Sequence, residues 1–364
     1  MVLIIRQGIS FLLSLFLLLG SPAAAAEDAP ALSAKSAVLM GRDGQILYEK
    51  DGDARRLIAS TTKLMTAILV LEEAALDEQI SIRPEWCRTE GSSMYLEEGQ
   101  TLTVRQLLLG LLLASGNDAA VALACHTAGS EAAFVRKMND KAAALGLRDT
   151  HFANPHGLND EAHYSTAADL GRLMAYCMEN QGFVALAGTE YCTVGEQTFT
   201  NHNKLLGRCP GCVAGKTGYT EKAGRCLVSC CEREGTRLIC VTLSDPDDWA
   251  DHMALYDWGF SRFAEREVTA ALRFPVPVIS GAAETVDAVP DPIRLLLPRT
   301  AALRLEAELP RFVFAPVEAG QRAGLARIFR GDELLAVTEL RYAASVSPAI
   351  RADARTSPYL ETQP

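Results

Sequence analysis

The chain has 364 residues, of which 49% are hydrophobic and 22% are charged, and its formal net charge at pH 7 is −10. This length is enough for two domains with a sizeable core, and the composition argues against wholesale disorder. Because binding to phosphates needs a basic surface, the acidic balance argues against nucleic acid as a partner.

The first 26 residues have the layout of a secretory signal peptide. A short segment carrying Arg6 precedes the apolar run ISFLLSLFLLLG, and Ala24-Ala25-Ala26 places small residues before Glu27. This pattern predicts a protein exported to the cell envelope, the periplasm or the medium. An uncleaved membrane anchor is the alternative, but the apolar run is short for a membrane span. Cleavage would move the net charge from −10 to −11.

Residues 27–272 read as one α/β domain. Two apolar runs around Arg42-Asp43-Gly44 predict a β-hairpin over 36–50. Residues 212–243 read as strands with a turn at Glu234-Gly235, which predicts a sheet that joins both ends of the domain. Apolar residues with helical spacing occupy the region between, over 61–75, 103–128 (interrupted at Ser115-Gly116-Asn117), 131–145 and 166–179.

A small all-β domain is predicted for residues 273–346. The segment RFPVPVISGAAETVDAVPDPIRLLLP lacks a helical period and reads as a linker leading into strands. Alternating segments follow over 300–346, with a hairpin turn at Gly331-Asp332. The tail, 347–364, is predicted to be disordered. It lacks the apolar face of an anchor helix, so at most a weak association with membranes is expected.

Ten cysteines are many for an exported chain. Cys209-Pro-Gly-Cys212 is a closely spaced pair, for which a local disulfide, a metal or redox role, and free thiols all remain open. Four others lie in apolar strand-like runs, where cysteine behaves as a small hydrophobic residue. They are Cys226, Cys230, Cys231 and Cys240.

The stretch ASTTKLMTA contains Ser60 and Lys63, three positions apart at the start of a helical pattern. This spacing places both side chains on one helix face. A serine hydroxyl needs a base to become a nucleophile, and a buried lysine near a helix N-terminus can be neutral and act as that base. A helix cap formed by Ser60, Thr61 or Thr62 is the simpler interpretation. Such a pair occurs about once by chance in a chain of this length.

Two further elements follow in the chain. Ser115-x-Asn117 comes after a buried helical segment, and Lys216-Thr217-Gly218 begins a strand. Individually these residues could be turn residues and a surface cation. Together, and in this order, the three elements form the signature of penicillin-binding proteins and class A β-lactamases.

The chain resembles the low-molecular-mass penicillin-binding proteins, which are serine-type D-alanyl-D-alanine carboxypeptidases. The resemblance is strong over residues 35 to about 263 and includes ASGNDAAVALA, FANPHGLND, NHNKLL and GKTGYTEKAGRCLV. It implies a penicillin-binding/β-lactamase-like transpeptidase fold, with an antiparallel sheet flanked by helices, followed by a small C-terminal β-sandwich. It also implies that peptidoglycan stem peptides are substrates and that β-lactams are covalent inhibitors.

The resemblance also implies roles for individual residues. Ser60 would attack the carbonyl of the penultimate D-Ala, Lys63 would be the general base, and Ser115 would relay a proton to the leaving D-Ala. The substrate-binding residues would be Asn117 on the peptide amide, Lys216 as electrostatic support, Thr217 on the terminal carboxylate, Gly218, and Tyr219, whose N–H would complete an oxyanion hole with that of Ser60.

One departure concerns the substrate carboxylate. Family members often have an arginine beyond the Lys-Thr-Gly strand, but here the segment VTLSDPDDWADHM is acidic, which leaves Arg225 as a candidate. A β-lactamase-like hydrolase and a non-catalytic cell-wall-binding protein remain alternatives. The histidine spacing matches no ligand motif, so neither a metal nor another cofactor is expected.

Overall fold

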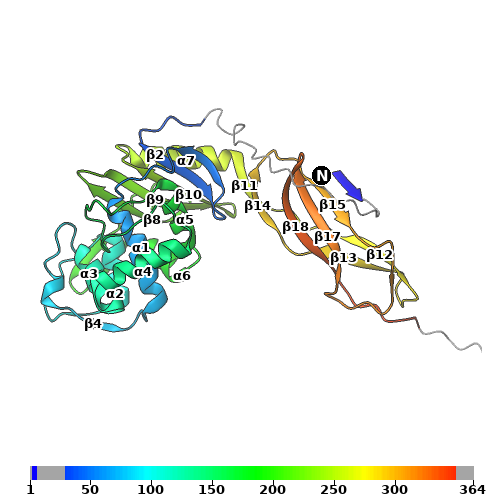
Figure 1. Ribbon diagram of the computed structural model, residues 1–364, viewed down its shortest axis with the longest axis horizontal. Coiled ribbons are helices and arrows are strands. Elements are labelled where there is room, and N and C mark those ends of the chain that lie inside the picture. Colours follow the sequence, from blue (N-terminus) through cyan, green and yellow to red (C-terminus); the bar gives the residue numbers. More distant parts are fainter. Residues whose placement is uncertain (1, 6–28, 350–364) are drawn as a thin grey trace, which may run out of the picture. The chain divides into compact units, whose positions relative to one another are not determined.

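The computed structural model describes residues 2–5 and 29–349, and these divide into two compact units (Figure 1). One unit comprises residues 29–263. The other comprises residues 264–349 together with strand β1 (Val2–Ile5). Apart from β1, the predicted signal peptide lies outside the described residues, as does the predicted disordered tail from residue 350 onward.

A five-stranded antiparallel sheet forms the centre of the first unit. Its strands follow the order β3-β2-β10-β9-β8, so the early hairpin pairs with the late strands, as predicted. Strand β8, which contains Lys216-Thr217-Gly218, lies at one edge. The bounds are β2 (Ser36–Gly41), β3 (Ile46–Lys50), β8 (Cys212–Thr220), β9 (Gly224–Arg233) and β10 (Thr236–Leu243).

Helices cover both faces of this sheet (Figure 1). Leu39 and Met40 are neighbours on β2 and therefore point to opposite faces. A Cβ at Gly259 of α7 (Asp248–Arg262) would touch Leu39, whereas a Cβ at Gly171 of α5 (Ala167–Cys177) would touch Met40. The two helices thus pack on opposite faces, each at a glycine that allows close approach.

The remaining helices confirm the predicted periodicity. The helical segment over 103–128 is interrupted where predicted, since Ser115 and Gly116 separate two buried helices. Helices α6 and α7 and the strand pairs β4–β5 and β6–β7 were not predicted. The helices besides α5 and α7 are α1 (Lys63–Glu73), α2 (Val104–Leu113), α3 (Asn117–Ala128), α4 (Glu131–Ala144) and α6 (Gln181–Ala187). Two short hairpins complete the unit, β4 (Gln79–Ser81) with β5 (Thr101–Thr103) and β6 (Tyr191–Val194) with β7 (Gln197–Thr200).

The second unit is a β domain, and the interpretation of its first segment as a linker was wrong. Strand β12 already occupies Phe274–Ile279, because Phe274, Val276 and Val278 alternate into the core while the prolines between them face out. The predicted hairpin at Gly331 joins β17 to β18. The strands are β11 (Phe263–Glu267), β12, β13 (Thr285–Pro290), β14 (Arg294–Pro298), β15 (Arg304–Glu308), β16 (Val313–Phe314), β17 (Arg322–Arg330) and β18 (Glu333–Tyr342). Across the two described ranges, no helix combines the length and the apolar character that crossing a membrane requires.

Candidate active site

Ser60 lies in a short 3₁₀ helix, η1 (Ala59–Thr62), which runs directly into α1. Ala59, which precedes it, has a φ of 47°, in the left-handed region where a non-glycine residue is strained. The alternative interpretation as a side-chain cap is wrong, because neither η1 nor α1 has a side-chain cap hydrogen bond. The Thr61 and Thr62 hydroxyls instead donate to the carbonyls of Ile58 and Ala59. Ser60 therefore has no capping function.

Lys63 is fully buried, and three groups surround its Nζ atom. Nζ lies 3.0 Å from Ser60 Oγ, 2.6 Å from Asn117 Oδ1 and 2.8 Å from the carbonyl oxygen of His156. Burial lowers the pKa of Lys63 well below its ordinary value, and the charge of Lys216 lowers it further, against a smaller opposing effect of Asp118.

The hydrogen-bond geometry shows what a neutral Lys63 would do. A neutral amine has two N–H bonds and one lone pair. Asn117 Oδ1 and the His156 carbonyl can only accept, so they take both N–H bonds. The lone pair is then left for Ser60 Oγ, which is the arrangement a general base requires.

A second lysine–serine pair lies beside the first. Lys216, on β8, is 1% exposed, and its Nζ donates to Ser115 Oγ over 3.0 Å and to the Thr217 carbonyl over 2.9 Å. Burial lowers the pKa of Lys216 to about 7. Ser115 has a φ of 60° in the break between α2 and α3, so its position also rests on strained backbone.

Asn117 lies next to Lys63, behind the pocket lining. Its side chain is buried, where Oδ1 accepts from Lys63 and Nδ2 donates to the Glu90 carbonyl over 2.6 Å. The next residue, Asp118, was missed by sequence reasoning. Its buried carboxylate accepts from Ser93 Oγ at 2.6 Å and from the backbone N–H groups of residues 94 and 96. The signal in the sequence was an aspartate that directly follows Ser-x-Asn and precedes the apolar run AAVALA.

The loop FANPHGLND positions the carbonyl that Lys63 contacts. Asn154 Oδ1 accepts from the backbone N–H groups of His156 and Gly157, at 3.3 and 2.6 Å. Gly157 has a φ of +95°, and a Cβ there would lie 1.9 Å from the Ala59 carbonyl oxygen. Only glycine therefore allows this loop to approach η1 so closely.

The buried histidines of this region have structural contacts. The Ala153 N–H donates to His163 Nδ1 over 3.0 Å, so His163 Nε2 carries the proton and donates to Thr62 Oγ1 over 2.7 Å. Burial lowers the pKa of His163 to about 4, which keeps the ring neutral. Within residues 2–5 and 29–349, no group of three or more His, Cys, Asp or Glu side chains is suited to hold a metal ion.

Strand β8 approaches Ser60 closely because residue 218 is glycine. A Cβ at Gly218 would lie 2.9 Å from the backbone nitrogen of Ser60 and 3.0 Å from the Ile58 carbonyl oxygen. Any side chain at this position would push the strand away from η1. Thr217 and Tyr219, on either side of Gly218, both line the pocket that opens over Ser60.

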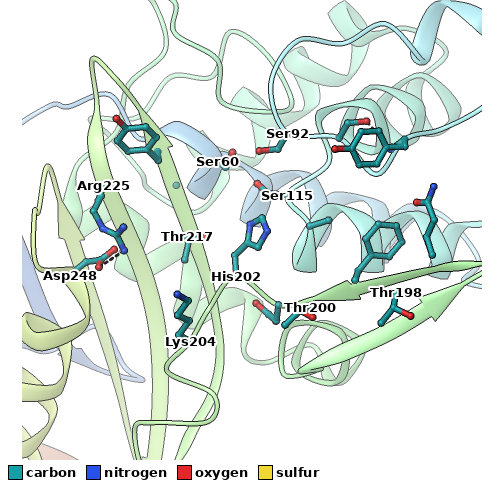
Figure 2. A pocket seen from close by; sticks show the side chains of 18 of the residues that line it. Ser60, Ser92, Ser115, Thr198, Thr200, His202, Lys204, Thr217, Arg225 and Asp248 are labelled. Carbon is teal, nitrogen blue, oxygen red and sulfur yellow. Dashed lines mark hydrogen bonds and ion pairs between the residues drawn. The ribbon is translucent and has the colours of Figure 1, made fainter.

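This pocket has a volume of about 990 Å³ (Figure 2). Ser60 and Ser115 lie at its centre, with β8 along one wall and residues 197–202, including His202, along another. Lys63, Asn117 and Lys216 are absent from its lining and support it from beneath. The structure thus brings together all the predicted site residues, with three of them behind the pocket surface.

Arg225 also faces the pocket, from strand β9 next to β8 (Figure 2). Its Nη2 lies 2.7 Å from Asp248 Oδ1, and its guanidinium lies over the ring of Trp249, 5.5 Å from the centroid. Its buried Nε has no hydrogen-bond partner. Asp248, which holds Arg225 at the pocket, belongs to the acidic segment that stands where family members often have an arginine.

The comparisons with known proteins agree with this geometry. The family model described as D-alanyl-D-alanine carboxypeptidase matches residues 23–247. D-alanyl-D-alanine carboxypeptidase DacF of Bacillus subtilis is 34% identical over 328 residues, which cover 83% of this chain and 83% of the relative. DacA of Escherichia coli is 35% identical over 257 residues, covering 64% and 62%.

Solved structures extend the likeness to both units. The chain superimposes on PBP3, a peptidoglycan synthesis regulatory factor of Streptococcus pneumoniae, with a TM-score of 0.73 and 28% identity, covering 87% of this chain and 100% of the other. For penicillin binding protein 5 of Haemophilus influenzae the TM-score is 0.72, with 27% identity and coverages of 87% and 98%. The chain therefore belongs to the D-alanyl-D-alanine carboxypeptidase family of serine DD-peptidases, the low-molecular-mass penicillin-binding proteins.

Proposed function

We propose that this enzyme removes the terminal D-alanine from peptidoglycan stem peptides through an acyl-enzyme on Ser60. The main support for this proposal is the environment of Lys63, in which two carbonyl oxygens take the N–H bonds and leave the lone pair for Ser60 Oγ. This arrangement activates a serine without a histidine.

In the acylation step, Ser60 Oγ attacks the carbonyl of the penultimate D-Ala while Lys63 takes its proton. The backbone N–H groups of Ser60 and Tyr219 stabilise the oxyanion, and the close approach at Gly218 supports this pairing. Ser115 passes a proton to the departing D-Ala, with Lys216 behind it as electrostatic support. Water then hydrolyses the ester.

Asn117 receives a positioning role in this proposal. Its Oδ1 fixes the direction of the Lys63 amine, and its Nδ2 anchors to the Glu90 carbonyl. Nδ2 carries a second N–H, to which we assign the peptide amide of the substrate, so Asn117 both positions Lys63 and binds the substrate.

The terminal carboxylate of the substrate binds to Thr217 and Arg225. Both side chains line the same end of the pocket, and Asp248 holds the guanidinium in place (Figure 2). β-Lactams, which resemble the D-Ala-D-Ala end, would acylate Ser60 and remain attached. The proposal also includes export, with residues 1–26 as the signal peptide. It includes at most a weak association with the membrane.

Labelling with a fluorescent penicillin tests the nucleophile. Wild type and a Ser92→Ala variant, which removes another pocket hydroxyl, should both label, and Ser60→Ala should not. Equal labelling of Ser60→Ala, or no labelling of the folded wild type, would refute the proposal. A β-lactamase-like hydrolase would instead show rapid turnover of the label, and a non-catalytic wall-binding protein would release no D-Ala.

A further inference from the structure

We infer that Cys209 and Cys231 form a redox-active thiol pair, which a low-molecular-mass disulfide oxidises to a cross-link that anchors the start of the catalytic strand β8. The two Sγ atoms lie 3.6 Å apart, although the residues are distant in the sequence. All ten cysteines are free thiols in the structure.

The local backbone directs Cys209 toward Cys231. The N–H of Cys212 donates to the carbonyl of Cys209 over 3.0 Å, which closes a tight turn around Pro210-Gly211. Strand β8 then begins, with Cys212 paired opposite Cys231 on β9. Three sulfur atoms therefore converge on one end of the sheet, with Cys231 in the middle.

The surroundings favour a thiolate at Cys209. Arg233 Nη2 donates to Cys209 Sγ over 3.6 Å, and its Nε donates to the Pro210 carbonyl, which holds the guanidinium against the turn. The hydrogen bond from Cys231 and the charge of Arg233 outweigh burial and lower the pKa of Cys209 to about 7. Both thiols are buried, but Cys209 is 3% exposed and Cys231 is completely buried, so Cys209 is the attacking thiol and Cys231 the resolving one.

The oxidation is an ordinary thiol–disulfide exchange. The Cys209 thiolate attacks one sulfur of the small disulfide, whose S–S bond breaks and releases a thiolate that takes up a proton. Cys231 then loses its proton, attacks Cys209 Sγ and displaces the second small thiol. In total, two protein thiols and one small disulfide give one protein disulfide and two small thiols.

The position of the pair explains what the cross-link would do. Strand β8 lies at the sheet edge, where β9 is its one sheet neighbour, and it carries Lys216, Thr217 and Gly218. A bond between Cys209 and Cys231 would enclose the whole of β8 in a covalent loop. The loop restricts the unfolded chain and ties the edge strand to its neighbour, so the oxidised protein should be more stable.

The test is to incubate the folded full-length protein with oxidised glutathione, block free thiols with iodoacetamide, and map disulfides by mass spectrometry. We expect the loss of two hydrogen atoms, a linked peptide pair containing Cys209 and Cys231, and a rise of several degrees in Tm that dithiothreitol reverses. Cys209→Ser and Cys231→Ala should each abolish the link, and Cys87→Ser should keep it.

Three results would overturn the inference: thiols that stay unmodified in the folded protein, a link between Cys209 and Cys212 instead, or a glutathione adduct on Cys209 that Cys231 does not resolve. Cys209→Ser alone decides the question if Cys231→Ala fails to fold. None of these readouts depends on peptidase activity, so failure here and failure of the proposed function are distinguishable.

Discussion

Lys63 Nζ lies 3.0 Å from Ser60 Oγ, and its two other neighbours are the Asn117 and His156 carbonyl oxygens, which can only accept hydrogen bonds. Burial and the nearby charge of Lys216 both lower the pKa of Lys63. Burial and Lys216 thus make a cation unfavourable here, and the two carbonyl contacts orient the neutral amine toward the hydroxyl.

The first prediction concerns the base. Lys63→Arg replaces the neutral amine with a guanidinium that cannot lose its proton, so acylation by penicillin should slow by roughly 10²–10⁴-fold. The rate is measured by quenching the labelling reaction with fluorescent penicillin after different times. Lys137→Arg is the control, since Lys137 is an exposed lysine paired with Glu73, and it should acylate normally. A Lys63→Arg variant as fast as wild type would exclude Lys63 as the base.

The second prediction concerns the pH dependence of stability. Lys216 has a pKa of about 7 in the folded chain, against an ordinary 10.5. Between these values the unfolded chain binds a proton that the folded chain does not, so this residue makes the free energy of unfolding rise with pH. The slope is at most about 1.4 kcal/mol per pH unit.

Lys216→Met removes this contribution. Urea unfolding of wild type and variant is measured at pH 7, 8 and 9. The free energy of unfolding of the variant minus that of wild type should decrease as pH rises. The charge of Lys216 also lowers the pKa of Lys63, so the change in the difference between the two proteins includes the altered titration of Lys63. A difference that stays constant across this range would show that Lys216 remains protonated in the folded protein.

The third prediction concerns Asp118. Asp118→Ala leaves several donors without an acceptor, among them Ser93 Oγ and the backbone N–H groups of residues 94 and 96, so the free energy of unfolding should fall by about 3 kcal/mol. Urea denaturation measures the change. Asp140→Ala, at an exposed position on α4, should leave stability within about 0.5 kcal/mol of wild type. Equal effects of the two substitutions would show that the Asp118 contacts contribute nothing specific.

The fourth prediction concerns Gly157 and separates the effect of a steric clash from that of a positive φ. Gly157→Ala places a Cβ against the Ala59 carbonyl, while Gly146→Ala, at a similar positive φ, meets open space. Both variants should lose the roughly 1 kcal/mol expected for strain. Gly157→Ala should in addition slow acylation at least tenfold, because η1 carries Ser60. If Gly157→Ala acylates as fast as Gly146→Ala, the loop does not position Ser60.

The fifth prediction concerns the carboxylate. Arg225→Ala should raise the KM for a peptide ending in D-Ala-D-Ala by roughly 10–100-fold, since it removes a charge-assisted contact. Asp248→Asn should have a smaller effect in the same direction, because it loosens the guanidinium. The control is Arg55→Ala, an exposed arginine paired with Asp149 outside the pocket. An unchanged KM in Arg225→Ala would assign the carboxylate to another group.

The sequence predicted the main elements of the first unit because their patterns are local. The hairpin at Gly44, the buried helices on either side of Ser115 and the strands around Glu234 each have a short-range signal. Helix α7 was missed although the acidic residues of its first turn, Asp248 and Asp251, are a signal for a helix N-terminus. The segment after residue 273 was misread because its prolines suggested a linker, whereas their rings occupy the outward positions of β12.

The site was predictable as a set of residues but less so in its geometry. Spacing alone could place Lys63 beside Ser60, but the contacts with Asn117 and the His156 carbonyl join segments far apart in the chain. The same holds for Arg225 with Asp248, and for Cys209, whose neighbour is Cys231 on the next strand. Trp249, which follows Asp248 on α7, also lines the pocket.

The most direct measurement of the central claim is the release of D-alanine from a pentapeptide ending in D-Ala-D-Ala. We expect wild type to produce free D-Ala and the tetrapeptide, with the acyl group trapped on the peptide containing Ser60 when the reaction is quenched early. Ser60→Ala and Lys63→Arg should release almost none. Release by Ser60→Ala at the wild-type rate, or a folded wild type that binds the peptide and releases no D-Ala, would contradict it.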